Sequence, residues 1–220
     1  MSIPNIFLMP GLGFDYRVFS NLDLKNCNIN YLDWLEPNKE ETLASYVERV
    51  EKQITFNNKP IILIGHSFGG IIVQEIANKN DVEKVIIISS IKSKDEIPLN
   101  LKFLKVFPVY KFLNKKLILK SFPIWARLFG YNSEKGRKLY NLMLDNCTNN
   151  YLRWSLEKIS HWEENYNLKN LVHIHGTNDK TFSIKLIDRP IKVKDGSHFM
   201  VFSRSEEVSE ILNKEIENSL

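Results

Sequence analysis

The stretch that decides the fold is PIILIGHSFGGIIVQ, residues 60–74. Ile61 to Ile64 show no polar alternation, which is typical of a strand buried on both faces. The glycines at positions 65, 69 and 70 then bracket Ser67 in the pattern Gly-x-Ser-x-Gly, and the apolar residues that follow have helical spacing. Because glycine lacks a Cβ, the helix can fold back close to the strand and lift the serine hydroxyl clear of the sheet. The stretch therefore predicts a strand, a sharp turn and a helix, with a reactive serine at the turn.

Such a short pattern also occurs by chance, so its interpretation depends on the rest of the chain. The start of the helix would place backbone N–H donors beside Ser67. A serine is a poor nucleophile at neutral pH and needs a base within hydrogen-bond reach. The chain must therefore also supply a base, an acid and a second backbone donor.

The composition is that of an ordinary globular protein. The chain has 220 residues, of which 43% are hydrophobic and 25% charged, and we expect residues 1–220 to form a single domain. No apolar run approaches the roughly 20 residues of a membrane span. The amino-terminal residues lack a basic segment and have too short an apolar core for a signal peptide. We therefore expect a cytoplasmic protein without a membrane span.

The net charge of +4 is unevenly distributed. Residues 92–138 contain 12 Lys and Arg residues against three acidic ones, a net of +9. A patch of this kind attracts anionic partners and raises their rate of association. The alternative is a solvated, lysine-rich surface without a function. We expect no nucleic-acid partner in either case.

Buried strands alternate with amphipathic helices along most of the chain. Strands are expected over residues 3–9, 27–34, 61–64, 83–90, 170–175 and 190–193, and helices over residues 42–54, 68–80 and 205–218. Thr42 is placed to cap the first of these helices. The alternation predicts an α/β fold with a mostly parallel, doubly wound sheet of about six strands.

The alternation stops over residues 92–162, which are aromatic, basic and helical in pattern. Prolines at 98, 108 and 123 are expected to divide this segment into short helices. Because it is too long for a structureless loop, we expect a helical cap inserted into the domain over one end of the sheet. Its aromatic residues form either the core of the cap or contacts to a substrate. The candidate substrate contacts are Phe14, Phe103, Phe107, Trp125 and Phe129.

Three polar residues follow predicted strands in the order Ser67, Asp179, His198. The carboxyl ends of parallel strands are where open α/β sheets bind ligands. Histidine suits the role of base, and a carboxylate fixes its tautomer. The other histidines fit the role of base less well, because they lie within the turn, a helix of the cap or a strand: His66, His161, His173 and His175. Asp95 is an alternative acid, but it lies five residues past its strand, so Asp179 is preferred. The glycine loop at residues 10–13 is placed to offer a backbone N–H, although an ordinary turn has the same sequence signature.

Together these segments resemble the α/β-hydrolase superfamily, in its small single-domain form with a helical cap. The resemblance covers nearly the whole chain and rests on PGLG at 10–13, GHSFGG at 65–70, HGTND at 175–179 and GSHF at 196–199. It implies Ser67 as nucleophile, His198 as base, Asp179 as the orienting acid, and the backbone N–H groups of Leu12 and Phe68 as an oxyanion hole. It implies no metal and no cofactor.

The chain departs from the family pattern in two respects. Many relatives have His-Gly where this chain has Pro10-Gly11, so a side-chain contribution is lost at that position. The leading hairpin of the family is also missing from the pattern, which is why six strands are expected instead of eight.

The resemblance implies acyl transfer to water. We expect a hydrolase that cleaves a carboxylic ester with a small to medium apolar acyl group through an acyl-enzyme. One alternative is a thioesterase or methyl esterase that acts on an acyl group linked to coenzyme A or to an acidic acyl carrier protein, which the basic cap would hold. Another is a ligand-binding protein of the same fold without catalysis.

Overall fold

The computed structural model describes residues 3–57, 59–129 and 133–219; among residues 122–129 it describes only the side chain of Ala126. Its centre is a sheet of six parallel strands in the order β2-β1-β3-β4-β5-β6. The strands are β1 (Asn5–Met9), β2 (Asn28–Tyr31), β3 (Ile61–His66), β4 (Lys84–Ile88), β5 (Leu171–Gly176) and β6 (Ile191–Val193). The predicted α/β fold with a six-stranded parallel sheet is confirmed.

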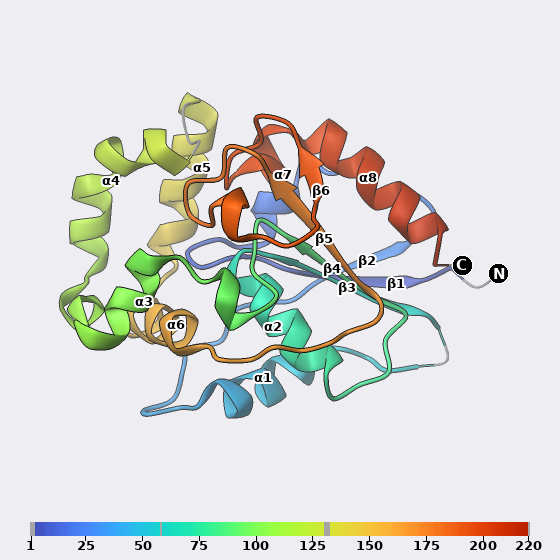
Figure 1. The fold of residues 1–220 in the computed structure, drawn as a ribbon, viewed down its shortest axis with the longest axis horizontal. Coiled ribbons are helices and arrows are strands. Elements are labelled where there is room, and N and C mark those ends of the chain that lie inside the picture. The colour runs from blue at the N-terminus through green and yellow to red at the C-terminus, as the bar shows by residue number, and fades with distance from the viewer. Residues whose placement is uncertain (1–2, 58, 130–132, 220) are drawn as a thin grey trace.

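Helices cover both faces of the sheet (Figure 1). On one face lie α1 (Leu43–Glu51) and α2 (Phe68–Ala77), and on the other α7 (Met200–Ser203) and α8 (Ser205–Glu217). Alternate residues of β3 pack into the two layers: Ile62 and Ile64 join the cluster of α8, and Leu63 joins that of α2. All six residues of β3 are buried. This two-sided burial explains why the strand reads as a continuous apolar run.

The structure agrees with the sequence prediction at the start of α1 but differs from it in the length of β2. The Thr42 hydroxyl caps α1 as predicted, accepting a hydrogen bond from the Ser45 N–H at 3.1 Å. Strand β2 lies at an edge of the sheet and its four residues are all exposed. It is shorter than the predicted 27–34 because only the segment from Asn28 to Tyr31 pairs with β1.

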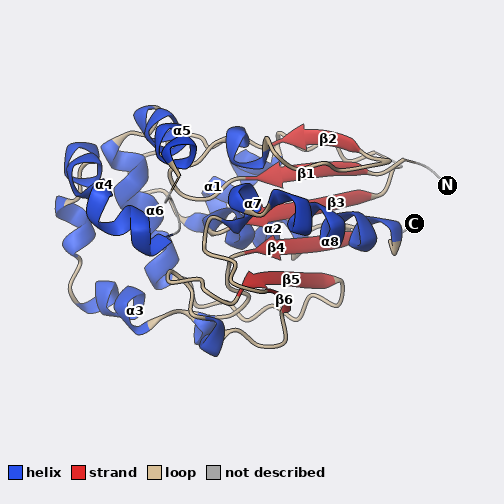
Figure 2. Ribbon diagram, turned by 90° about the horizontal axis from the view of Figure 1, so that it is seen from above, coloured by secondary structure: helices blue, strands red, loops and turns tan. Residues whose placement is uncertain are grey.

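Between β4 and β5 in the sequence, the described residues form four further helices, which lie beyond the carboxyl ends of the strands (Figures 1 and 2). We call them the cap helices: α3 (Leu99–Val106), α4 (Lys115–Phe129), α5 (Glu134–Asp145) and α6 (Asn149–His161). Short 3-10 helices occur at Tyr16–Phe19, Lys94–Glu96, Val109–Phe112 and Ile184–Leu186. None of the helices within the described residues is long and apolar enough to cross a membrane.

The prolines of this segment only partly act as predicted. Pro98 and Pro108 directly precede α3 and the 3-10 helix at Val109–Phe112. Helix α4, however, continues through Pro123. A proline removes only one backbone donor from a helix, and in α4 that loss does not end the helix.

Helix α6 ties the cap helices to the layer of α1 and α2. The Trp154 indole donates to the Glu41 carbonyl at 2.8 Å, and its ring lies 4.3 Å from that of Tyr46. Just after α6, the indole of Trp162 donates to the buried carboxylate of Glu75 on α2 at 2.7 Å. The cap segment is therefore anchored through directed polar contacts as well as apolar packing.

Candidate active site

Ser67 stands at the turn between β3 and α2 in a strained backbone conformation. Its φ of 53° lies in the left-handed region, which a residue with a side chain adopts at a cost of about 1–3 kcal/mol. Two hydrogen bonds hold it there: its N–H donates to the Ile88 carbonyl at 2.9 Å, and the Ser90 hydroxyl donates to its carbonyl at 2.7 Å. In this conformation its hydroxyl lies 2.9 Å from His198 Nε2.

The glycine at position 69 lets α2 begin against the sheet. A Cβ at Gly69 would lie 2.3 Å from the Met9 carbonyl oxygen and 2.4 Å from that of Pro10. Both atoms belong to the backbone and cannot move aside without distorting β1. The second glycine of the Gly-x-Ser-x-Gly pattern is therefore required for a close backbone contact between the start of α2 and the end of β1.

The structure brings Ser67, His198 and Asp179 together. His198 Nδ1 lies 2.9 Å from Asp179 Oδ2, and His198 Nε2 lies 2.9 Å from Ser67 Oγ. A carboxylate accepts, so Nδ1 carries the proton and Nε2 is left to accept from the serine hydroxyl. All three residues are buried, with Ser67 only 7% exposed. The hydroxyl, the imidazole and the carboxylate therefore form one chain of hydrogen bonds, in which His198 can accept the proton of Ser67.

Asp179 is held in its ionised form by its surroundings. Burial by itself raises the pKa of this carboxyl, but the electrostatic and hydrogen-bonding effects of His198, His175 and the Phe182 N–H together lower it below its usual range. The N–H groups of Thr181 and Phe182 add hydrogen bonds to Oδ1 at 2.8 and 3.0 Å. The loop after β5 therefore presents a carboxylate, with Oδ2 directed at the imidazole.

The glycine loop after β1 packs directly against Ser67. A Cβ at Gly11 would lie 2.9 Å from the Ser67 Cβ. The Trp34 indole donates to the Gly11 carbonyl at 3.1 Å, and its ring stacks on Phe68 with centroids 5.1 Å apart. Within the described residues, the N–H groups of Leu12 and Phe68 have no hydrogen-bond partner. Two residues with free backbone donors are thus held next to the serine. Sequence reasoning missed Trp34, which no local pattern links to this loop.

A pocket of about 190 Å³ opens beside Ser67 and His198. Its walls are mostly apolar and come from the loop after β1, α3, α5, α6 and the loop after β5. The lining residues are Leu12, Phe14, Ser67, Leu101, Tyr140, Leu156, Ile159, Thr181, Phe182 and His198. The pocket has the size and polarity of a site for a small apolar group next to a reactive hydroxyl.

The predicted substrate contacts have three different outcomes. Phe14 lines the pocket. Phe103 and Phe107 do not: they are 55% and 52% exposed and stack on each other at 4.5 Å. Phe103 lies on the outer side of α3 and Phe107 directly follows the helix. Leu101 lines the pocket from the other side of α3, which helical periodicity could have indicated. The side chains of Trp125 and Phe129 fall outside the described part of the structure.

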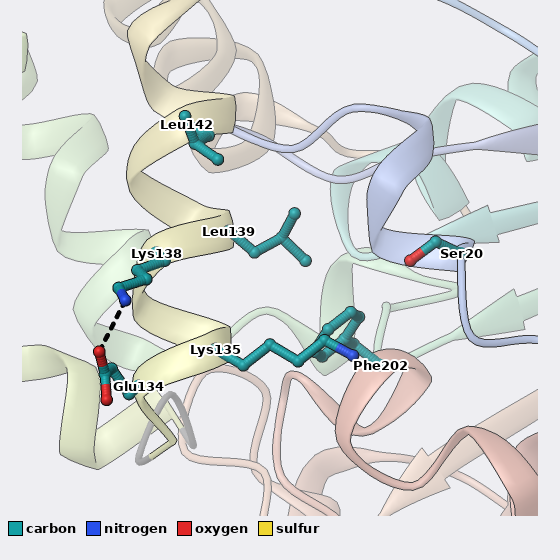
Figure 3. Close-up of a pocket in the computed structure, with 7 residues that line it drawn as sticks. All are labelled: Ser20, Glu134, Lys135, Lys138, Leu139, Leu142 and Phe202. Carbon is teal, nitrogen blue, oxygen red and sulfur yellow. Dashed lines mark ion pairs between the residues drawn. The ribbon is translucent and has the colours of Figure 1, made fainter.

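Two residues that the sequence offers as an alternative acid and an alternative base lie away from the three aligned residues. Asp95 is exposed in the 3-10 helix after β4, and His161 is exposed at the end of α6. A larger cavity of about 640 Å³ lies between Phe202 and α5 and contains none of the three aligned residues; its rim carries the Glu134–Lys138 ion pair (Figure 3). Within the described residues, no group of three or more His, Cys, Asp or Glu side chains could hold a metal ion.

Three further buried histidines surround the aligned residues. His66 Nε2 donates to the His198 carbonyl at 3.0 Å. On β5, His175 Nε2 donates to the Phe182 carbonyl at 2.8 Å and lies 3.5 Å from Asp179 Oδ2. His175 Nδ1 is then left to accept from His173 Nε2 at 3.1 Å. Sequence reasoning set these histidines aside because they lie within the turn and a strand, yet two of them anchor the loops of the base and the acid.

The comparisons with known proteins agree with the fold. A family model described as the alpha/beta hydrolase family matches residues 6–211. The chain belongs to the alpha/beta hydrolase family. A search of curated proteins finds no match.

Solved structures of this family resemble the chain over nearly its full length. A lipase-esterase related protein from Clostridium acetobutylicum is 21% identical, with a TM-score of 0.71 over 97% of this chain and 94% of that one. An esterase from Exiguobacterium antarcticum is 16% identical, with a TM-score of 0.72 over 97% and 91% of the two chains. YbtT, a type II thioesterase from the yersiniabactin NRPS/PKS biosynthetic pathway, is 14% identical, with a TM-score of 0.67 over 99% and 94%. At these identities the likeness is one of fold.

The pH dependence of stability tests the buried state of His66. Burial lowers the pKa of His66 from its ordinary 6.5 to about 3, so the unfolded chain binds a proton that the folded chain excludes. The corresponding stability is complete above pH 6.5 and is lost as the pH falls toward 3. When the pH is lowered from about 7 to about 5, one such histidine lowers the free energy of unfolding by about 2 kcal/mol.

When the pH is lowered from 7 to 5, we therefore expect the free energy of unfolding of His66→Gln to fall by about 2 kcal/mol less than that of the wild type. Urea unfolding at both pH values measures this difference. Glutamine keeps a donor for the His198 carbonyl. Burial also lowers the pKa of His173 and His175, so the variant retains part of the pH dependence. Equal losses in the two proteins would contradict a neutral, buried His66.

Proposed function

We propose that this hydrolase cleaves a carboxylic ester through an acyl-enzyme formed on Ser67. The observation that carries the proposal is the alignment of Ser67, His198 and Asp179 beside an apolar pocket, with both hydrogen bonds at 2.9 Å. A serine is activated when a base stands within this distance and a third group orients the base. The family and the esterases among its structural neighbours agree with this chemistry.

In the first half of the reaction, Ser67 Oγ attacks the ester carbonyl carbon while His198 Nε2 takes the hydroxyl proton. The carbonyl oxygen becomes an oxyanion, which the N–H groups of Leu12 and Phe68 would stabilise; a donor of this kind contributes about 3 kcal/mol. Collapse of the tetrahedral intermediate breaks the ester bond. His198 gives its proton to the leaving alcohol, and the acyl group stays on Ser67.

In the second half, water takes the place of the alcohol. His198 removes a proton from the water as its oxygen attacks the acyl carbon, and then returns a proton to Ser67 Oγ as the carboxylic acid leaves. Asp179, ionised beside Nδ1, stabilises the imidazolium that forms in both halves. The enzyme is restored after one ester and one water are converted into one acid and one alcohol.

The pocket suggests which acyl groups would be accepted. Its volume of about 190 Å³ and its apolar walls suit a short or medium apolar acyl chain. Phe14 from the loop after β1, Leu101 from α3 and Leu156 from α6 line this space. We infer that the cap helices help to select the acyl group.

A thioester of coenzyme A or of an acyl carrier protein is the second candidate substrate. Two observations favour it: the net charge of +9 over residues 92–138, and the fold likeness to a type II thioesterase from an NRPS/PKS pathway. The same acyl-enzyme chemistry would cleave a thioester, with a thiol as leaving group. An acidic carrier would approach the basic cap through long-range attraction, which salt screens.

The two substrates differ in their expected salt dependence. For a small neutral ester, kcat/KM should change little between low and high salt. For an acyl carrier substrate, we expect kcat/KM to exceed that of the ester and to fall about tenfold or more when salt is raised. A salt-independent rate without preference for the carrier would exclude this role of the basic cap.

Covalent labelling tests the nucleophile. We expect a fluorophosphonate probe to label the wild type and Ser197→Ala, because the serine at 197 lies beside His198 outside the aligned set. Ser67→Ala should remain unlabelled and hydrolyse esters at least about 10³-fold more slowly. A folded but unlabelled wild type would favour a ligand-binding protein of this fold, and labelling of Ser67→Ala would mean that another residue is the nucleophile.

Trp34→Phe tests the backbone donors. The phenyl ring keeps the stacking on Phe68 but loses the donor to the Gly11 carbonyl. Because the oxyanion forms only in the transition state, we expect kcat for an ester to fall about tenfold with little change in KM. The matched control is Trp162→Phe, which loses an indole hydrogen bond to the Glu75 carboxylate on α2 and should leave kcat unchanged. Equal effects of the two variants would argue against a role for Trp34 in positioning the loop.

A further inference from the structure

Large apolar side chains are exposed at one end of the molecule, on the elements from α3 to the start of α4. Leu99 is 83% exposed, Phe112 82% and Val106 71%. Phe103, Phe107, Val109 and Leu117 in the same segment are each more than half exposed. Figures 1 and 2 show α3 and α4 at the end of the molecule opposite both chain termini. A contiguous run of exposed apolar side chains marks an interaction surface, because single exposed residues are ordinary and clusters are not.

The exposed residues of α3 share one side of the helix. Leu99, Phe103 and Val106 are spaced by four and three positions, which places them on the same face. Phe107 continues the stripe by stacking on Phe103 at 4.5 Å. Val109 and Phe112 are three positions apart in a 3-10 helix, so they too point the same way. We call the segment from Leu99 to Lys120 the apolar–basic face.

The charge of this region has a single sign. Residues 97–133 contain no Asp or Glu and seven Lys or Arg. Lys102, Lys111, Lys116 and Lys120 are exposed, and no ion pair is found for them within the described residues. Lys105 and Lys115 pair with Glu163 and Asp145 from outside the face. The exposed lysines therefore present uncompensated positive charge beside the exposed apolar side chains.

We propose that the apolar–basic face docks on the surface of an anionic lipid bilayer. Segments that lie in a membrane interface combine large apolar side chains, which enter the boundary between headgroups and acyl chains, with lysines that contact anionic headgroups. A second copy of this chain fits poorly, because it would bring the same positive charges together. An acidic protein would satisfy the lysines, but side chains as exposed as Leu99 and Phe112 gain more from insertion into an apolar phase.

The same helix faces the pocket beside Ser67 with its other side. Leu101 lines the pocket, and the exposed stripe begins two residues earlier at Leu99. Docking would therefore place α3 between the lipid and the candidate active site. The inference goes beyond the hydrolysis proposed above and does not depend on it, since it rests on exposure and charge alone.

Vesicle sedimentation of the full chain tests the proposal. We expect the wild type to bind vesicles of phosphatidylcholine mixed with phosphatidylglycerol, to bind pure phosphatidylcholine vesicles more weakly, and to lose affinity when salt is raised. Leu99→Asp combined with Phe112→Asp should lower the affinity about tenfold or more. Lys102→Glu combined with Lys116→Glu should do the same, with the loss confined to the anionic vesicles.

Matched variants at the far end of the molecule serve as controls. Phe56→Asp replaces an exposed phenylalanine in the loop before β3, and Lys25→Glu with Lys214→Glu replaces two exposed lysines. Both control variants should bind vesicles like the wild type, and circular dichroism should show every variant folded. Because binding is the readout, a protein without hydrolase activity leaves this test unaffected.

Four results would overturn the proposal. One is a wild type that binds neither kind of vesicle. Another is unchanged binding in both the Leu99/Phe112 and the Lys102/Lys116 variants. The third is a wild-type dimer, without vesicle binding, that Leu99→Asp with Phe112→Asp dissociates, because the face would then join two copies. The fourth is binding of an acidic acyl carrier protein, in place of vesicles, that the same substitutions abolish.

Discussion

The contact between the start of α2 and the end of β1 is the constraint on which the site depends. At Gly69 the two backbones approach so closely that a single Cβ would overlap the Met9 and Pro10 carbonyls. This approach brings the glycine loop after β1 against the turn at Ser67, and with it the N–H groups of Leu12 and Phe68. The left-handed backbone at Ser67 persists because the surrounding strands and Ser90 hold both of its peptide groups.

Buried polar groups organise the rest of the site. His66 and His175 come from the ends of β3 and β5, and each donates to a backbone carbonyl in the loop that carries His198 or follows Asp179. An unpaired polar group in such an interior is costly, so each directed bond favours one arrangement of the loop. Neutral histidines meet this need without placing further charges near Asp179. The geometry of the three aligned residues therefore depends on side chains that have no part in the proposed chemistry.

Much of the fold could be read from local patterns. The buried strands, the Thr42 cap and the helix after Ser67 follow from hydrophobic period and capping chemistry, which act over a few residues. The order Ser67, Asp179, His198 could be recognised because each residue lies in the segment that follows a strand. The cap segment was harder: its apolar residues face either the pocket or solvent, as Leu101 and Phe103 do from opposite sides of one helix. Only the packing of α3 against the core decides which side is which.

The sequence by itself determined the sheet, the turn at Ser67 and the set of residues that meet there, because strand burial and glycine requirements are local. The tertiary structure decided the rest. It joined Trp34 to the loop at Gly11, placed His66 behind His198, and turned the stripe from Leu99 to Val106 outward. These contacts depend on distances between elements far apart in the chain. The residue pattern within a single element therefore does not predict them.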